Sequence, residues 1–166
     1  MTSLHPLRKF LFTLRALALG TAMLTALGSS GCQKHGVDGS GGQIATVGVA
    51  EVTAKLVEIR GELPADPLYD YAFVFKYEVQ KVHRGQIADR VIYVAHYLPL
   101  KPRNAVTDAR SGPVNGDVEV LRAGDVHRLA LEFPVENHYM GGLVNRYFDD
   151  GVKTIYSAVW TNRVLP

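Results

Sequence analysis

Apolar and polar residues alternate with a period of two along most of the chain from Ile44 onward. The clearest run covers residues 71–84 and stops at Gly85. One parity of this run is apolar and the other is polar: Phe73, Phe75, Tyr77 and Val79 against Lys76, Glu78 and Gln80. Such a pattern predicts a half-buried β-strand that ends at the glycine.

Other segments share this period. Residues 44–59 predict a long first strand, and a change of apolar parity near Ala50 indicates a β-bulge within it. Residues 89–100 are apolar on both faces, so we expect that strand to be covered on both sides. Residues 126–134 and 154–165 predict two more strands, and 118–125 a short strand and turn.

The intervening segments have no helical periodicity. Residues 99–117 form a long loop, and residues 136–151 are expected to be mostly irregular. Five or so strands with long loops and no convincing amphipathic helix predict an all-β domain, most simply a small barrel of five to six strands. A β-sandwich is the alternative.

The run KYEVQKVHRGQIADRVIYVAHYL resembles the second and third strands of netrin-like domains. The pieces that match the family pattern are Arg84-Gly85 at the end of a strand, the apolar strand Val91 to Ala95, and the turn Gly124-Asp125 before Val126. This resemblance implies an OB-type barrel. Netrin-like metalloprotease inhibitors use disulfides and an N-terminal cysteine, whereas this chain has a single cysteine, so their activity is not carried over.

The whole chain also resembles uncharacterised bacterial exported proteins that share the signatures DYAFVFKYEVQKVHRG and AVWTNRV. Some of these proteins accompany polysaccharide O-acetylation machinery. That second resemblance implies a location in the cell envelope and no defined activity.

The first 31 residues have the three parts of a secretory signal peptide: a basic start, an uncharged apolar run, and small residues. The apolar run, 16–28, is shorter than the ~20 residues that span a bilayer. Residues 32–43 are rich in glycine and predict a flexible tether. Residues 44–166 then form the single folded domain.

Cys32 is the only cysteine and directly follows the small residues. Its context resembles the lipobox of bacterial lipoproteins, although Ser29 stands where that pattern prefers leucine. The resemblance implies lipidation of Cys32 and anchoring in a membrane that faces the periplasm or the cell surface. Cleavage after Gly28 by ordinary signal peptidase is the alternative, and it leaves a free thiol on a soluble periplasmic or secreted protein.

The charge of the chain is unevenly distributed. The leader holds 3 of the 18 basic side chains and no acidic one, which leaves 15 basic against 16 acidic residues in the remainder. This near-neutral balance argues against a nucleic-acid partner.

No local motif predicts catalysis, a cofactor or a metal ion. The serines lie outside Gly-x-Ser-x-Gly, and the histidines are scattered, although a hydrolase or transferase site assembled from distant residues stays an alternative. Two regions are candidate binding surfaces, for an envelope protein or a polysaccharide: Lys101, Arg103 and Arg110 in one loop, and His138, Tyr139, Arg146 and Tyr147 in another. Ordinary solvated or packed loops are the alternative in both cases.

Overall fold

The computed structural model describes residues 47–65, 69–109, 111–152 and 154–165. Seven strands lie in this part of the chain: β1 Ala50–Glu58, β2 Tyr71–Arg84, β3 Val91–Tyr97, β4 Asn115–Gly116, β5 Val126–Glu132, β6 Gly142–Val144 and β7 Ile155–Arg163. Three single-turn 3₁₀ helices lie between them: η1 Arg103–Ala105, η2 Val135–Asn137 and η3 Phe148–Asp150.

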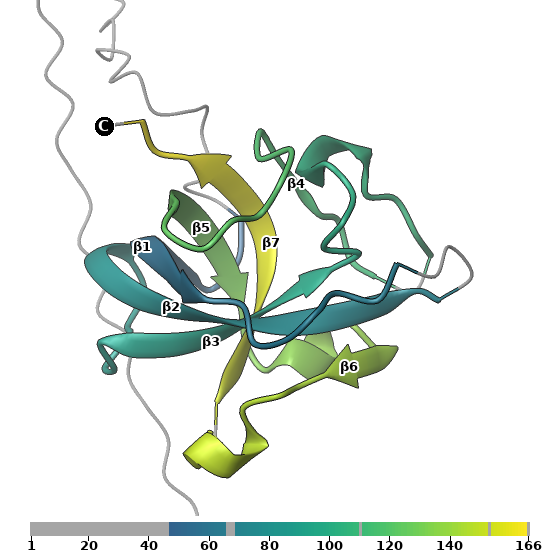
Figure 1. Ribbon diagram of the computed structural model, residues 1–166. Coiled ribbons are helices and arrows are strands. Elements are labelled where there is room, and N and C mark those ends of the chain that lie inside the picture. The colour runs from purple at the N-terminus through teal and green to yellow at the C-terminus, as the bar shows by residue number, and fades with distance from the viewer. Residues whose placement is uncertain (1–46, 66–68, 110, 153, 166) are drawn as a thin grey trace, which may run out of the picture. The chain divides into compact units, whose positions relative to one another are not determined.

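Five strands close into a barrel, in the order β1-β2-β3-β7-β5 and back to β1 (Figure 1). All neighbouring pairs are antiparallel except β3 and β7, which run parallel. The first strand pairs with both β2 and β5, so the sheet has closed on itself and is not a two-sheet sandwich. The prediction of a small all-β barrel is therefore confirmed, and the strand order is that of an OB-type barrel.

Two short strands extend the barrel. β6 pairs in parallel with the start of β2, and β4 pairs in parallel with the second half of β7. Gly116 sits so close to β7 that an added Cβ would lie 2.0 Å from the carbonyl oxygen of Thr161, and its φ is +135°. A glycine is therefore required for this pairing.

The barrel interior is filled by the inward parity of each strand, as the alternation predicts. The fully buried members include Val52, Ala54, Leu56, Phe73, Phe75, Tyr77, Val94, Leu129 and Leu131. β2 ends as expected, since Gly85 adopts a φ of +77° immediately after it.

A second apolar cluster lies on the outer side of β2 and β3. Ala72 and Val74 on β2, with Ala95 and Tyr97 on β3, pack against Val106, Val114, Val135, Tyr139 and Tyr147 from the long loops. This covering explains why both faces of β3 are apolar in the sequence.

Two details differ from the sequence-based expectations. The first strand starts at Ala50, after Gly48 with its φ of +71°, and is therefore shorter at its beginning than expected. The expected irregularity near Ala50 is present, since the register with β2 shifts between Glu51 and Val52. The strand expected within 118–125 does not form; the short strand in this region is β4. β4 forms because Gly116 can approach β7 closely. The local alternation of apolar and polar residues gives no sign of this contact.

Candidate functional site

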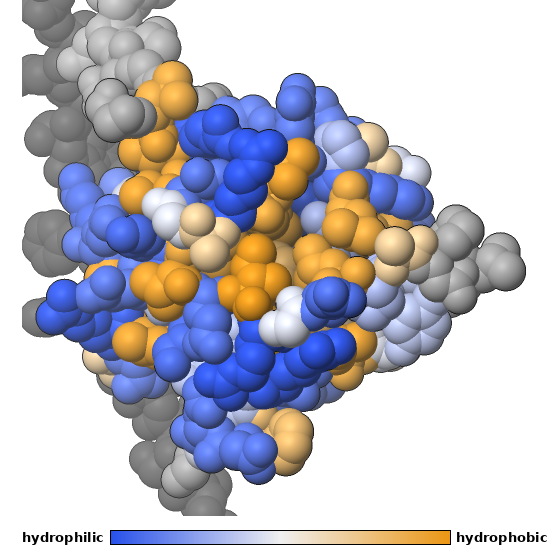
Figure 2. Space-filling model, in the orientation of Figure 1, coloured by the Kyte–Doolittle hydropathy of each residue, from blue (hydrophilic) through white to orange (hydrophobic). Residues whose placement is uncertain are grey.

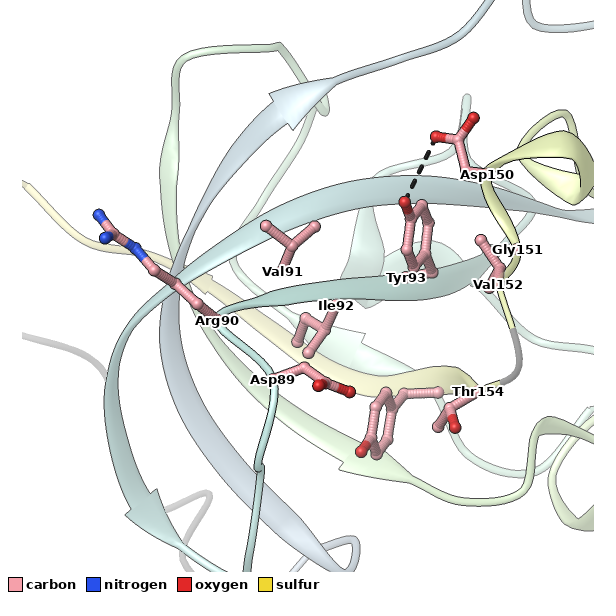
Figure 3. A pocket seen from close by; sticks show the side chains of 10 residues that line it. Asp89, Arg90, Val91, Ile92, Tyr93, Asp150, Gly151, Val152 and Thr154 are labelled. Carbon is pink, nitrogen blue, oxygen red and sulfur yellow. Dashed lines mark hydrogen bonds between the residues drawn. The ribbon is translucent and has the colours of Figure 1, made fainter.

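A cleft of about 360 Å³ opens on the outside of the barrel beside the starts of β3 and β7 (Figure 3). These strands are paired from Tyr93 and Ile155 onward, and the cleft lies beside the preceding residues of each segment. Its walls come from both segments: Asp89, Arg90, Val91, Ile92, Tyr93, Asp150, Gly151, Val152, Thr154 and Tyr156.

The cleft combines aromatic rings with carboxylates. The hydroxyl of Tyr93 donates a hydrogen bond to Asp150 at 3.4 Å, which Figure 3 shows as a dashed line. The ring of Tyr156 is half-buried and lies 5.5 Å from the ring of Phe133. Burial, together with the nearby carboxylate of Asp89, raises the pKa of Tyr156. Rings and hydrogen-bonding groups together suit a ligand that has both apolar faces and hydroxyl groups.

A network of four charged side chains fixes one wall of the cleft. The guanidinium of Arg60 binds both carboxylate oxygens of Asp150, at 2.9 and 3.0 Å, and Glu58 at 3.0 Å. Lys76 lies 3.7 Å from Asp150 and 3.9 Å from Glu58. The hydrogen bonds from Arg60 are the main reason that the pKa of Asp150 is lowered, so this carboxylate stays ionised at neutral pH.

The same network rests on a buried tyrosine. The guanidinium of Arg60 lies 4.2 Å from the ring centre of Tyr147, whose side chain is completely buried. The Tyr147 hydroxyl donates to the carbonyl of Glu58 and accepts the backbone N–H of Arg60, both at 3.1 Å. Burial raises the pKa of Tyr147 to about 12. These contacts tie the chain after β1 to the loop before β7, so the wall of the cleft is held in place before any ligand arrives.

The barrel interior contains a second group of polar side chains. The Tyr77 hydroxyl lies 3.1 Å from Nε2 of His96 and 3.1 Å from Nδ1 of His127. All three residues are completely buried. The remaining ring nitrogens, His96 Nδ1 and His127 Nε2, have no hydrogen-bond partner among the described residues.

This arrangement is compatible with two neutral imidazoles. One ring nitrogen accepts the tyrosine proton while the other donates its own N–H to the tyrosine oxygen. Burial lowers the pKa of His96 well below its ordinary value and that of His127 to about 4. Because no atom of the group reaches solvent, a substrate cannot contact it without opening the barrel.

Arg103 is the most consequential correction to the expected binding surface. Its side chain is only 1% exposed and donates to the carbonyl oxygens of Tyr97, Leu98 and Lys101 at 2.8, 2.5 and 2.6 Å. Burial lowers its pKa to about 10, so it still carries its charge at neutral pH. Arg103 therefore holds together the turn that follows β3 and does not face an anionic partner.

The other expected surface residues separate in space. Tyr139 and Tyr147 are 5% and 0% exposed and pack in the outer apolar cluster, so their expected role on a surface is corrected as well. His138 is half-buried against Gly112, whereas Lys101 and Arg146 are exposed. The tyrosines are buried because the loops fold back onto β2 and β3, which the loop sequence alone does not show.

Two expectations fall outside the described residues. Arg110 and Cys32 both lie there, so Arg110 as a surface cation and Cys32 as the point of lipid attachment stay predictions.

The cleft residues were not among the expected site residues. In the sequence Tyr93 lies within the strand predicted over residues 89–100, and Asp150 lies at the end of the irregular segment 136–151. The available signal was the cluster Tyr147–Gly151, which places aromatic and acidic residues next to a glycine. What could not be read from the sequence is that β3 and the segment before β7 lie side by side.

No family model, curated protein or solved structure matches the chain. In the part that the structure describes, no three His, Cys, Asp or Glu side chains gather where they could share a metal ion. The same residues include no helix of sufficient length and apolarity to cross a membrane.

Proposed function

We propose that the chain is a non-catalytic binding module of the bacterial envelope, attached through Cys32, that takes a carbohydrate chain in the cleft between β3 and β7. The observation that supports this proposal is the cleft itself, in which Tyr93 and Tyr156 stand beside Asp89, Asp150 and hydrogen-bonding groups. In OB-type barrels the face of strands two and three commonly binds oligosaccharides or oligonucleotides. In this chain the long loops cover the outer side of β2 and β3, and the open cleft lies beside the next strand pair, β3 and β7.

The charge balance favours sugar over nucleic acid. The chain after the leader is close to neutral, whereas nucleic-acid binders need a clear excess of cations. On the face seen in Figure 2, hydrophobic residues form small groups with hydrophilic residues around them. A mixed surface of this kind suits a polyhydroxylated ligand better than a large obligate protein interface.

The geometry offers little to a glycosidase. Hydrolysis of a glycosidic bond needs one carboxyl group that is protonated at working pH. Asp150 cannot be that group, because Arg60 and Lys76 hold it in the ionised form. Both of its oxygens are bound by Arg60, so they are not free to act as the ionised carboxylate that the reaction also needs. Binding without hydrolysis is therefore the function that the cleft supports best.

The test is titration of the mature chain with a panel of surface-type oligosaccharides, followed by calorimetry and amide NMR shifts. Tyr93→Leu should weaken binding by about fivefold, because an aromatic contact contributes about 1 kcal/mol beyond its buried area. Tyr69→Leu is the matched control, since Tyr69 is 46% exposed and does not line this cleft. Absence of binding across the panel, or equal losses in both variants, would reject the proposal.

Tryptophan fluorescence is a poor reporter for that experiment. Trp160 lies four residues beyond Tyr156 on β7, or about 13 Å at the usual rise per residue. Its ring nitrogen donates to Asn162 at 2.8 Å, away from the cleft walls.

A protein partner is the second candidate, on a different surface. Met140 and Leu143 flank the two glycines at the start of β6 and are 89% and 37% exposed. Tyr69 lies close to Gly142 and is 46% exposed, which adds to the same apolar area. Loss of a co-purifying envelope protein in Met140→Ser/Leu143→Ser, with glycan binding intact, would favour this candidate.

A further inference from the structure

The cleft has an unequal distribution of paired and unpaired charge. Arg60 and Lys76 are already engaged by Asp150 and Glu58, so these four side chains neutralise one another. Beyond them, the cleft is lined by one more cation, Arg90, and one more anion, Asp89. The charge that the cleft presents to a ligand therefore depends on whether Arg90 and Asp89 face the cleft and whether they are paired.

Arg90 is directed away from the cleft. Its guanidinium binds the carboxylate of Glu78 at 2.6 Å, and Figure 3 shows the side chain pointing out from the strand, away from Tyr93 and Asp150. It is therefore not available to an acidic sugar lying between the two walls.

Asp89 is the charge that remains. It is exposed and makes no hydrogen bond or ion pair with any described residue. Figure 3 shows its side chain extending across the cleft toward Thr154, and its carboxylate is close enough to Tyr156 to raise the pKa of that phenol. Among the described residues, the cleft is thus left with one uncompensated negative charge beside a tyrosine ring.

We propose that this cleft selects sugar residues bearing a free ammonium group, such as deacetylated hexosamines, over acidic sugars. The inference rests on the carbohydrate-binding function proposed above and names the class of sugar. The pyranose ring would lie against Tyr93 or Tyr156, and its ammonium would donate to the carboxylate of Asp89. A uronic acid at the same place would meet Asp89 with like charge.

The experiment compares three oligosaccharides of equal length against the mature chain: oligoglucosamine, oligo-N-acetylglucosamine and oligoglucuronate. Calorimetry at about pH 6 keeps the amine protonated. We expect oligoglucosamine to bind about two- to fivefold more tightly than the acetylated form, as for an exposed ion pair, and the preference to shrink with added salt.

Variants assign the preference to one carboxylate. Asp89→Asn should abolish the preference for oligoglucosamine over oligo-N-acetylglucosamine. Asp149→Asn is the matched control, because Asp149 is an exposed acid next to the cleft that does not line it. It should keep the full preference.

The outcomes separate the two proposals. Equal affinity of the wild-type chain for glucosamine and N-acetylglucosamine oligomers would overturn this inference and leave carbohydrate binding standing. Tightest binding of oligoglucuronate would overturn it as well. No binding of any of the three, together with no binding across the wider panel, would reject both.

Discussion

Acidification should destabilise this barrel before its carboxylates protonate, because two imidazoles are buried in the neutral form. His127 has a pKa of about 4 in the fold, against about 6.5 in the unfolded chain. The unfolded state therefore binds more protons between these two values, and the free energy of unfolding falls as the pH is lowered through this range. The contribution is fully present above about pH 6.5 and is lost as the pH approaches 4.

The size of the effect follows from that difference. About 2.5 pH units correspond to about 3 kcal/mol for His127 alone. His96 is also completely buried and its pKa is lowered, so it acts in the same direction. Against a total stability of about 5–15 kcal/mol, this loss is easily measured.

The assay is urea denaturation of the purified protein from about pH 4 to 8, followed by circular dichroism, with the urea midpoints compared at a constant m-value. The double variant His96→Gln/His127→Asn keeps a hydrogen-bonding atom near each original nitrogen and removes both titrations. Its stability should therefore fall much less than that of the wild type between about pH 6.5 and 4.5. Burial also lowers the pKa values of His83 and His138, which leave a residual pH dependence. His83→Gln is the control: burial lowers the pKa of His83 as well, but this residue lies at the exposed end of β2, so the variant should keep most of the pH dependence of the wild type. Equal wild-type stability at about pH 4.5 and 7.5 would refute the argument. So would a double variant whose free energy of unfolding depends on pH as strongly as that of the wild type.

Three further outcomes are expected. Arg103→Leu should lower the free energy of unfolding by about 3 kcal/mol in the same denaturation assay, because it leaves three backbone carbonyls without their buried donor; Lys101→Leu, at an exposed position, should change it by less than about 0.5. Gly116→Ala should destabilise by at least about 2 kcal/mol, because the new Cβ meets the backbone of Thr161, whereas Gly124→Ala meets no atom within 4 Å and carries only the penalty of its φ of +100°. Cys32→Ser should move the chain from the membrane fraction to the soluble periplasmic or secreted fraction. An intact-mass spectrum of the native protein should show the acyl chains, and an unmodified Cys32 would disprove the lipoprotein prediction.

The barrel could be predicted because its strands alternate so regularly. On β2 the inward side chains are the ones that the period of two assigns to the apolar face, such as Phe73, Phe75 and Tyr77. The double apolar face of β3 likewise indicated a covering layer, which the outer cluster provides. Side-chain parity is a local property, so a sequence records it directly.

The candidate site could not be predicted in the same way, because it depends on contacts between distant segments. Arg103 looked like a solvated loop cation, yet the three carbonyls that it binds draw it into the turn after β3. Tyr147 looked like a surface aromatic residue, yet its hydroxyl donates to the carbonyl of Glu58 at the end of β1 and accepts the backbone N–H of Arg60. A polar side chain with enough buried partners is drawn away from the surface, and those partners lie 2 to 89 residues away in the sequence.

The burial of these side chains also limits which parts of the barrel a ligand can contact. His96 and His127 are completely buried inside the barrel with Tyr77, and the ring of Tyr147 packs against the guanidinium of Arg60. The cleft beside Tyr93 is open to solvent, and the ion pair between Arg60 and Asp150 holds one of its walls in place. The proposed preference for uncharged or cationic sugar units rests on this pre-formed cleft, whose neighbouring cations Arg60 and Lys76 are already neutralised by Asp150 and Glu58 and so offer little to a polyanion.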